Sequence, residues 1–351
     1  MKIAIDVSPL QTGHKIRGVG FYLEYLKQSL VKYHPQHEYQ FFTDSKELNS
    51  SIDLVHYPYF DPFFLTLPTL KKYKTVVTVH DLTPLIFPEH FPVGVKGSLR
   101  WQLQKMNLKK VDAILTDSES SKKDILRIIG VPAKKVSVSY LAAGDEFQKI
   151  SDQRARIDAV RKKFALPEKF ILYVGDVTWN KNLPNLIAAV QQKNLPLVMV
   201  GKSLVQKDFD KTNPWNRDLV EVQKLVQNDP SIFLLGFVST EELVALYNCA
   251  TVFVMPSLYE GFGLPVIEAL QSGCPVVTTK GGSLPEVAED AVYYVDEHSV
   301  ESISKGLYEV YSNVTLQKEL SQKGIKQAKK FSWKKTADQT LAVYQSIYKP
   351  K

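Results

Sequence analysis

The sequence predicts an α/β protein made of two doubly wound domains, each with a parallel sheet between helices. Short apolar strands alternate with helical segments along the whole chain, and 351 residues exceed the size at which one hydrophobic core usually stops growing. The strands are continuous apolar runs, which is typical of sheets covered on both faces. Such sheets bind ligands beyond the carboxyl ends of their strands, so we expect functional residues there, facing a cleft between the domains.

Each half of the chain contains the same alternation. The strands expected in the first half are residues 2–7, 39–42, 54–57, 75–79, 113–116 and 136–140. Those expected in the second half are residues 170–174, 197–200, 232–235, 252–255, 276–278 and 292–295. A helix is expected after Gly20, since the apolar residues of that segment recur at helical spacing.

A polar, charge-rich stretch over residues 144–163, with helix-forming content but little apolar periodicity, suits a linker that leads into the second domain. We place the boundary near Ser151, which gives an N-terminal domain of residues 1–150 and a C-terminal domain of residues 151–331. Residues 332–351 form one more helical pattern. The sequence leaves its domain open, and packing back on the N-terminal domain is one outcome.

Composition narrows the class of protein. The chain is 44% hydrophobic without low-complexity bias, and the apolar run at its start ends at Asp6, too early for a signal peptide or a membrane span. Cys249 and Cys274 offer no disulfide framework, so we expect a cytoplasmic protein, with contact at the inner face of the membrane as an option. The net charge of +7 favours anionic partners, but scattered basic residues argue against nucleic acid.

The most informative stretch is MPSLYEGFGLPVIEA, from Met255 to Ala269. A strand ends, a turn with two glycines follows, and Pro265 opens a helix. Backbone amides beside glycines can approach a ligand closely, and the start of a helix favours a phosphate. Glu260 and Glu268, spaced E-x(7)-E, can bind hydroxyl groups at the two ends of one nucleotide-sugar. The structural alternative is a glycine turn followed by an acidic residue that complements the helix dipole.

Residues 260–269 resemble the signature of retaining glycosyltransferases of family 4, which have the GT-B fold of two Rossmann-like domains. The resemblance extends along almost the whole chain. Its supporting motifs are YVG at 173–175 with KNL at 181–183, LGFV at 235–238 with EELVAL at 241–246, TDSESSK at 116–122 and FSW at 331–333.

The resemblance implies that Glu268 binds the ribose and that Glu260 contacts the donor sugar near its reacting carbon. Lys181 offers a cation to the leaving diphosphate, where negative charge develops in the transition state; an exposed lysine at a helix start is the alternative. The other donor-binding residues that the resemblance implies are Gly261, Phe262, Gly263, Leu264, Asn182 and Val238. No cofactor is expected besides the nucleotide diphosphate sugar, which is a substrate.

This chain departs from the family pattern in the loop that binds the donor phosphates. Many relatives carry an arginine directly after the glycine of this loop, whereas this chain has Asp176, and Asn180 stands where a second arginine is common. Phosphate neutralisation must therefore come partly from elsewhere. Lys202 and Arg17 are candidates, although a solvated surface lysine is the simpler interpretation of Lys202.

Two motifs of the N-terminal half follow strands. Arg17, Gly18 and Gly20 form RGVG, a loop that can approach a donor phosphate, but it lacks the third glycine of a dinucleotide fingerprint. His80 and Asp81 follow the strand at 75–79. The resemblance implies that His80 contacts the donor sugar and acts in catalysis, while Asp81 orients the imidazole or the acceptor. A histidine satisfied by a hydrogen bond at the strand end is the alternative, and His56 is expected to be structural.

Two further segments are weighed against simpler interpretations. The DFD sequence at 208–210 resembles a metal-binding aspartate pair, but its polar setting indicates a solvated loop, and we expect no metal. Residues 95–111 carry Leu99, Leu103 and Met106 on one helical face, with basic residues elsewhere. Contact with an anionic membrane is one interpretation. An ordinary amphipathic helix with a basic solvent face is the interpretation that we favour.

The sequence hypothesis is therefore a retaining, metal-independent glycosyltransferase. It would transfer a hexose-type sugar from GDP-mannose or a UDP-sugar to a glycan or lipid-linked acceptor in polysaccharide or glycolipid synthesis. Domain closure would exclude water, and the family resemblance implies retention through front-face attack. The alternatives on the same architecture are a nucleotide-sugar epimerase, a phosphorylase and a non-catalytic two-domain sugar-binding protein.

Overall fold

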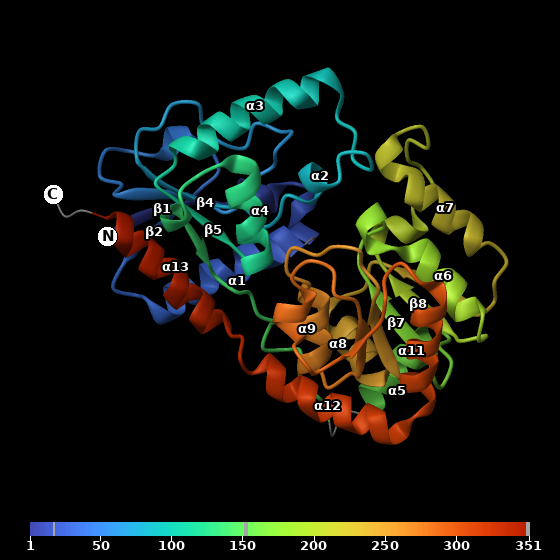
Figure 1. Cartoon of the computed structure of the whole chain (residues 1–351). Helices are drawn as coiled ribbons and strands as arrows, with labels where there is room; N and C mark the ends of the chain where they lie inside the picture. Colours follow the sequence, from blue (N-terminus) through green and yellow to red (C-terminus); the bar gives the residue numbers. More distant parts are fainter. Residues whose placement is uncertain (17, 151–153, 349–351) are drawn as a thin grey trace. The chain divides into compact units, whose positions relative to one another are not determined.

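The computed structural model describes residues 1–16, 18–150 and 154–348. The chain divides into two compact units (Figure 1). Unit 1 contains Met1–Ala142 and the C-terminal segment from Phe331, and unit 2 contains Ala143–Lys330. Ser151, where the sequence places the boundary, lies outside the described residues. The C-terminal helix belongs to unit 1, where it packs against the first long helix.

Unit 1 is a six-stranded parallel sheet with the strand order β2-β1-β3-β4-β5-β6. Its strands are β1 (Lys2–Asp6), β2 (Glu38–Phe42), β3 (Leu54–Tyr57), β4 (Lys74–Thr78), β5 (Ala113–Thr116) and β6 (Val136–Val138). Its helices are α1 (Gly18–Tyr33), α2 (Thr83–Ile86), α3 (Gly94–Lys110), α4 (Glu119–Ile129) and α13 (Trp333–Ile347). Short 3-10 helices lie at Ser8–Gln11, Gly13–Ile16, Ser45–Glu47 and Ala133–Lys135.

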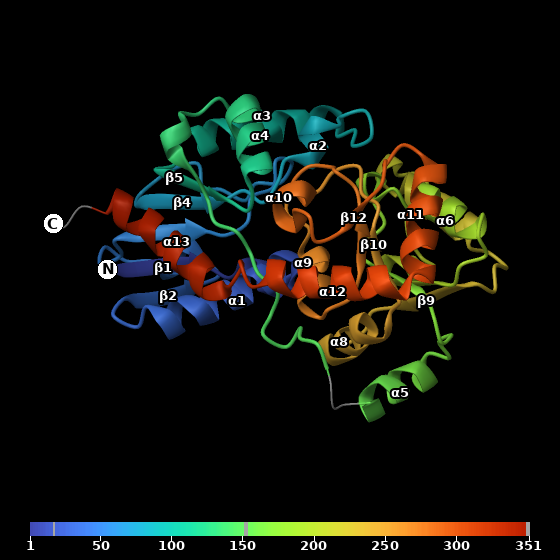
Figure 2. The same ribbon diagram turned by 60° about the horizontal axis from the view of Figure 1, so that its bottom comes forward.

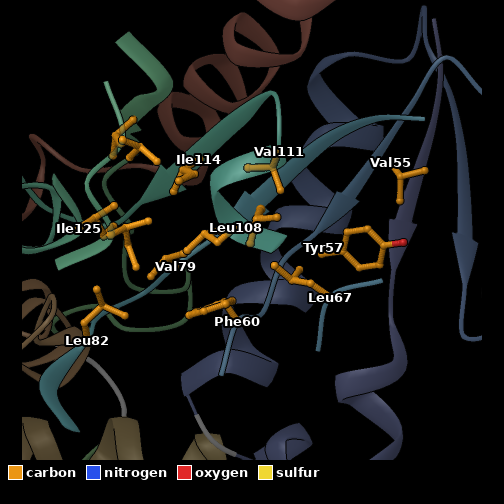
Figure 3. Close-up of a cluster of buried hydrophobic side chains, with 14 of the residues drawn as sticks. Val55, Tyr57, Phe60, Leu67, Val79, Leu82, Leu108, Val111, Ile114 and Ile125 are labelled. Atoms are coloured by element: carbon orange, nitrogen blue, oxygen red, sulfur yellow. The ribbon is translucent and has the colours of Figure 1, made fainter. Parts of the chain in front are cut away.

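Both faces of this sheet are covered because alternate side chains of each strand point to opposite sides. On one face, Val55 and Tyr57 of β3 join Ile114 of β5 in a buried cluster with Leu108 of α3 and Ile125 of α4 (Figure 3). On the other face, β3 presents His56, whose Nδ1 lies 2.7 Å from the hydroxyl of Tyr344 in α13. The helices α1 and α13 pack together there (Figure 2).

Unit 2 is a second six-stranded parallel sheet, with the strand order β12-β11-β10-β7-β8-β9. Its strands are β7 (Ile171–Val174), β8 (Leu197–Val200), β9 (Ile232–Gly236), β10 (Val252–Met255), β11 (Val276–Thr278) and β12 (Tyr293–Tyr294). Its helices are α5 (Arg154–Lys163), α6 (Leu183–Gln191), α7 (Arg217–Leu225), α8 (Thr240–Cys249), α9 (Leu264–Gln271), α10 (Leu284–Ala288), α11 (Val300–Ser312) and α12 (Val314–Ala328). Short 3-10 helices lie at Trp179–Lys181, Lys202–Val205 and Pro214–Asn216.

The order of these strands creates a switch point between β7 and β10. From β7 the chain moves outward to β8 and β9, and it then returns to β10 on the other side of β7. Right-handed crossovers put α6 and α8 on opposite faces of the sheet, as Figure 1 shows. The loops that leave β7 and β10 therefore diverge at the carboxyl edge, where doubly wound sheets bind ligands.

The predicted fold class, two doubly wound parallel-sheet domains, is confirmed, and every expected strand is present within a residue or two. One local prediction was wrong. The first long helix begins at Gly18 and not after Gly20, because 3-10 turns occupy the connection from β1. The helix-forming content of residues 144–163 has its counterpart in α5, which forms within them and packs on α8.

Candidate functional site

The loop between β10 and α9 ends at Gly263, in a backbone conformation that favours glycine over other residues. Gly263 adopts φ +91°, in the left-handed region, and a Cβ there would lie 3.0 Å from Leu284 Cδ2. Pro265 follows in the first turn of α9, where its missing N–H is not needed. Gly263 stands at the N-cap and has no side chain with which to cap α9, so the positive end of the helix dipole faces the loop.

Glu260 and Lys181 form an ion pair at the switch point. The Lys181 Nζ donates to both carboxylate oxygens of Glu260, at 2.7 and 2.9 Å. The buried Ser257 hydroxyl donates to Oε1 of the same carboxylate at 2.5 Å. Glu260 itself is only 7% exposed, so this carboxylate is held in one orientation by its neighbours. The structure thus brings together two predicted residues from loops that are far apart in the sequence.

A second glycine turn supports this loop, and the sequence reasoning missed it. Gly282, with φ +65°, packs so closely that a Cβ would lie 2.3 Å from the Glu260 carbonyl oxygen, and a Cβ on Gly281 would lie 2.4 Å from that of Leu258. Ser283 donates to the Glu260 carbonyl from its backbone N–H, at 3.0 Å, and from its hydroxyl, at 3.1 Å. The adjacent glycines that follow β11 after two intervening residues were the signal that would have found this turn.

Two asparagines fasten the loop that carries Lys181 to the loop that carries Glu260. The Asn180 amide donates to the Tyr259 carbonyl at 2.9 Å, and the Leu258 N–H donates to the Asn180 carbonyl at 2.8 Å. Asn182, in the left-handed region at φ +59°, donates to the carbonyls of Pro256 and Glu297. The side-chain amide nitrogen of Asn182 therefore binds the protein's own backbone.

Glu268 lies within α9, and its carboxylate accepts a hydrogen bond from a neighbouring helix. The Tyr247 hydroxyl of α8 donates to Oε2 at 2.9 Å. Burial raises the pKa of Glu268 to about 7, although the Tyr247 hydrogen bond opposes this shift. A carboxyl group that titrates near neutral pH beside a candidate ligand loop is a functional signal.

The remaining predicted donor residues of unit 2 lie around these loops. Gly261 and Phe262 are buried in the loop before α9, and Leu264 opens the helix. Val238 is buried between β9 and the capped start of α8. Beside it Phe237 is 61% exposed at the sheet edge.

Asp176, which stands where many relatives have an arginine in the phosphate loop, is held by hydrogen bonds within unit 2. Asp176 accepts a hydrogen bond from the Ser203 hydroxyl at 3.0 Å, and its carbonyl accepts one from Tyr173 at 2.8 Å. A Cβ on Gly201 would lie 2.1 Å from the Gly175 carbonyl oxygen, so the loops after β7 and β8 touch. Lys202 follows this contact with an exposed side chain, as the surface interpretation expects.

In unit 1, the partly buried His80 pairs with the buried Asp117, a partner that the sequence did not predict. Its Nδ1 lies 2.6 Å from Asp117 Oδ2, and its Nε2 lies 3.2 Å from the Pro58 carbonyl oxygen. Burial alone would lower the pKa of His80, but the Asp117 carboxylate outweighs this effect and raises it. Because a carbonyl oxygen only accepts, Nε2 carries a proton. Both ring nitrogens are engaged with the protein, which matches the alternative of a satisfied histidine at a strand end.

The other predicted residues of unit 1 lie near this pair or outside the described chain. Asp81 accepts a hydrogen bond from the Thr83 N–H at 2.9 Å. Gly18 and Gly20 lie in the first turn of α1, so they do not form the loop expected from the sequence. Arg17 lies outside the described residues. His56 is fully buried, and burial lowers its pKa to about 3, as befits a structural histidine.

The described part of the chain contains neither a clustered metal site nor a membrane-spanning helix. Its histidine, cysteine, aspartate and glutamate side chains form no group of three or more suited to a metal ion. Asp210 accepts hydrogen bonds from Thr212 in an exposed loop. Within the same described ranges, no helix has the length and apolar character needed to cross a bilayer.

Two six-stranded parallel sheets, each in a compact unit of its own, match the GT-B architecture that the sequence resemblance implied. The family models agree: residues 156–330 match "Glycosyl transferases group 1" and residues 17–142 match "Glycosyltransferase Family 4". The chain belongs to this glycosyltransferase family.

Curated relatives include two proteins of Escherichia coli. O-antigen chain mannosyltransferase B is 30% identical over 305 residues, which cover 84% of this chain and 76% of that protein. Serotype-specific mannosyltransferase WbdA is 31% identical over 287 residues, which cover 79% of this chain but only 34% of WbdA. The chain thus matches most of the first relative and about a third of the second.

Solved structures share the fold at low sequence identity. Sucrose-phosphate synthase from Thermosynechococcus elongatus has a TM-score of 0.79 at 18% identity, with 99% of both chains covered. HepE of Anabaena, solved in complex with UDP-glucose, has a TM-score of 0.74 at 16% identity, covering 99% of this chain and 100% of HepE. These likenesses extend the GT-B architecture over the whole chain.

Proposed function

We propose that the protein is a retaining mannosyltransferase that uses GDP-mannose and acts on a glycan or lipid-linked acceptor in polysaccharide synthesis. The observation that carries the proposal is the Glu260–Lys181 pair beside the uncapped first turn of α9, with Glu268 further along the same helix. The choice of mannose is supported by the mannosyltransferase names of several relatives. A nucleotide-sugar donor is supported by the UDP-glucose bound in HepE.

Each group at this site has a chemical task in the proposed reaction. The ionised Glu268 accepts hydrogen bonds from the ribose hydroxyls. The start of α9 and the Lys181 ammonium stabilise the diphosphate as it leaves, and this electrostatic stabilisation acts mainly in the transition state. The donor diphosphate competes with Glu260 for Lys181, so donor binding loosens the ion pair and frees a carboxylate oxygen for the sugar.

Retention by front-face attack is supported by the hydrogen bonding of Glu260. Its Oε1 accepts from the Ser257 hydroxyl, and this hydrogen bond persists when the donor diphosphate draws Lys181 away, so the carboxylate stays a weak nucleophile. The acceptor oxygen would therefore attack the anomeric carbon on the face that the diphosphate leaves. The leaving phosphate oxygen takes the acceptor proton, the bond from the anomeric carbon to the phosphate oxygen breaks, and the new glycosidic bond forms on the same side. No metal or cofactor takes part in this scheme.

A transfer assay tests the proposal. The full chain is incubated with GDP-mannose or UDP-glucose and a mannose-terminated acceptor, and the anomeric configuration of the product is read by NMR. We expect an α-linked product from GDP-mannose, and Lys181→Met should lower kcat at least a hundred-fold. Lys162→Met, an exposed lysine of α5, is the matched control. An inverted product, a new sugar nucleotide without acceptor, or full activity in Lys181→Met contradicts the proposal.

A further inference from the structure

A segment at the start of unit 2 is fastened to α8. Residues 143–150 follow directly on the main segment of unit 1, but they pack with unit 2. The Asn248 side chain of α8 accepts a hydrogen bond from the Ile150 N–H at 2.7 Å and donates one to the Gln148 carbonyl at 3.0 Å. We call residues 143–150 the strap. Two hydrogen bonds to one side chain hold its far end on α8.

The near end of the strap contacts the surroundings of Glu268. The Gln271 amide, three residues after Glu268 on the same helix, donates to the Gly144 carbonyl at 2.9 Å. The Phe147 ring is 3% exposed and lies edge-on to the Tyr247 ring, with 5.9 Å between their centres. Tyr247 is fully buried, and its hydroxyl is the group that donates to Glu268 Oε2. The strap therefore reaches the carboxylate through one aromatic side chain.

Phe147 and Phe253 both contact the Tyr247 ring. Phe253 of β10 lies edge-on to it with 5.4 Å between ring centres, and Phe147 contacts it from the strap. Aromatic pairs of this kind hold a defined mutual geometry. Because a tyrosine hydroxyl lies on the axis of its ring, the orientation of the Tyr247 ring sets the direction of the hydrogen bond to Glu268. Phe147 therefore helps to aim the hydroxyl at the carboxylate.

The strap also brings a second carboxylate near Glu268. Glu146 is exposed on the strap. Burial raises the pKa of Glu268, the Tyr247 hydrogen bond opposes this shift, and the negative charge of Glu146 adds to it. The Cys274 thiol lies near Tyr247, and burial raises the pKa of this thiol, so it stays uncharged. Within the described chain, the groups that set the charge of Glu268 are thus Tyr247 from α8 and Glu146 from the strap.

We propose that the strap positions the Glu268 carboxylate, with Phe147 acting on it through Tyr247. The proposal rests on the function proposed above, in which Glu268 binds the donor ribose. Phe147 is a positioning residue and not a catalytic one, because it acts through the tyrosine. Since the strap follows directly on unit 1 along the chain, the covalent connection between the units runs past the ribose-binding group. A displaced strap should therefore weaken the binding of the nucleotide-sugar.

Carbon-13 NMR of the glutamate carboxyl groups in the full chain, without donor, tests the positioning. Glu268→Gln assigns the resonance, and titration gives the pKa of Glu268 in each variant. Phe147→Leu should raise this pKa by about 0.7, which is an about five-fold change in proton affinity and the worth of one aromatic pair. Asn248→Ala frees the far end of the strap and should also raise it. Glu146→Gln should lower it, because a like charge is removed.

A double-mutant cycle separates positioning from a general loosening of the fold. In a Tyr247→Phe background, Phe147→Leu should leave the pKa of Glu268 unchanged, because the hydrogen bond through which Phe147 acts is already absent. Phe170→Leu, at a fully buried position directly before β7, is the matched control for lost packing, and Glu301→Gln is the control for lost charge. Neither control should shift the pKa.

Calorimetry with GDP-mannose at pH 7 measures the effect on the donor. Phe147→Leu should weaken binding at least about three-fold, because the ionised fraction of Glu268 falls from about one half to about one sixth. Equal pKa shifts in Phe147→Leu and Phe170→Leu overturn the proposal. So does a shift by Phe147→Leu that persists in Tyr247→Phe, or an unshifted pKa in Phe147→Leu. Absence of nucleotide-sugar binding by the unchanged chain counts against the proposed function instead, and the NMR titration then decides the role of the strap.

Discussion

Replacing Glu268 by glutamine should abolish a pH dependence of donor binding near neutrality. Burial raises the pKa of Glu268 to about 7. Ribose hydroxyls need an acceptor, so the ionised carboxylate is the binding form. With this pKa, roughly nine tenths of the molecules carry the carboxylate at pH 8 and about one tenth at pH 6. The affinity for the nucleotide-sugar should therefore fall by about ten-fold from pH 8 to pH 6.

Calorimetry with the nucleotide-sugar alone measures this dependence at pH 6, 7 and 8. Glu268→Gln should bind more weakly at pH 8 and show a flat profile. Tyr247→Phe removes the hydrogen bond that favours the ionised form of Glu268. The pH at which this variant loses affinity for the nucleotide-sugar should therefore be higher than in the unchanged chain. Glu301→Gln, at an exposed position of α11, should keep the profile of the unchanged chain. A ten-fold step that persists in Glu268→Gln, or a flat profile in the unchanged chain, refutes the assignment.

Three further predictions address the supporting contacts. Ser257→Ala removes the 2.5 Å hydrogen bond to Glu260. Loss of a hydrogen bond to a charged group should lower kcat about ten-fold and preserve donor affinity, and an unchanged kcat contradicts this prediction. Gly282→Ala places a Cβ 2.3 Å from the Glu260 carbonyl oxygen, so activity and the unfolding temperature should both fall, whereas Gly13→Ala, with nothing within 4 Å, should change neither. Asp117→Asn removes the carboxylate paired with His80 and should lower the free energy of unfolding in urea by about 3 kcal/mol, against about 0.5 kcal/mol or less for Glu319→Gln in an exposed pair on α12.

The sheets were predictable because continuous apolar runs leave few alternatives. Val252–Met255 and Leu197–Val200 have the same limits in the sequence reasoning and in the structure. The start of α1 was not predictable in this way. Gly18 and Gly20 are poor helix formers, so local preference indicates a loop, whereas in the folded chain Gly20 is buried within the first turns of α1.

Part of the candidate site could likewise be predicted from the sequence, and part could not. The glycine turn before α9 and its glutamates follow a strand, and that position is visible in the sequence. The partners are not, because Lys181–Glu260 and Tyr247–Glu268 join segments that meet only through the strand order. His80–Asp117 depends on β4 lying beside β5. Leu99 and Met106 of α3 show the converse limit, since they are 67% and 53% exposed although the favoured interpretation turned the basic face of this helix to solvent. Helical spacing identifies an apolar face but not which side of the helix is buried.

Because α13 packs in unit 1, the N-terminal sheet needs the last helix of the chain to complete its fold. Tyr344 is fully buried there against His56, so the N-terminal sheet lacks part of its interior until the last helix has left the ribosome. Residues 143–330 are a continuous segment and are synthesised before that helix. Unit 2 can therefore complete its folding before α13 is available to unit 1. This order is the reverse of the N-to-C order usual for nascent multidomain chains.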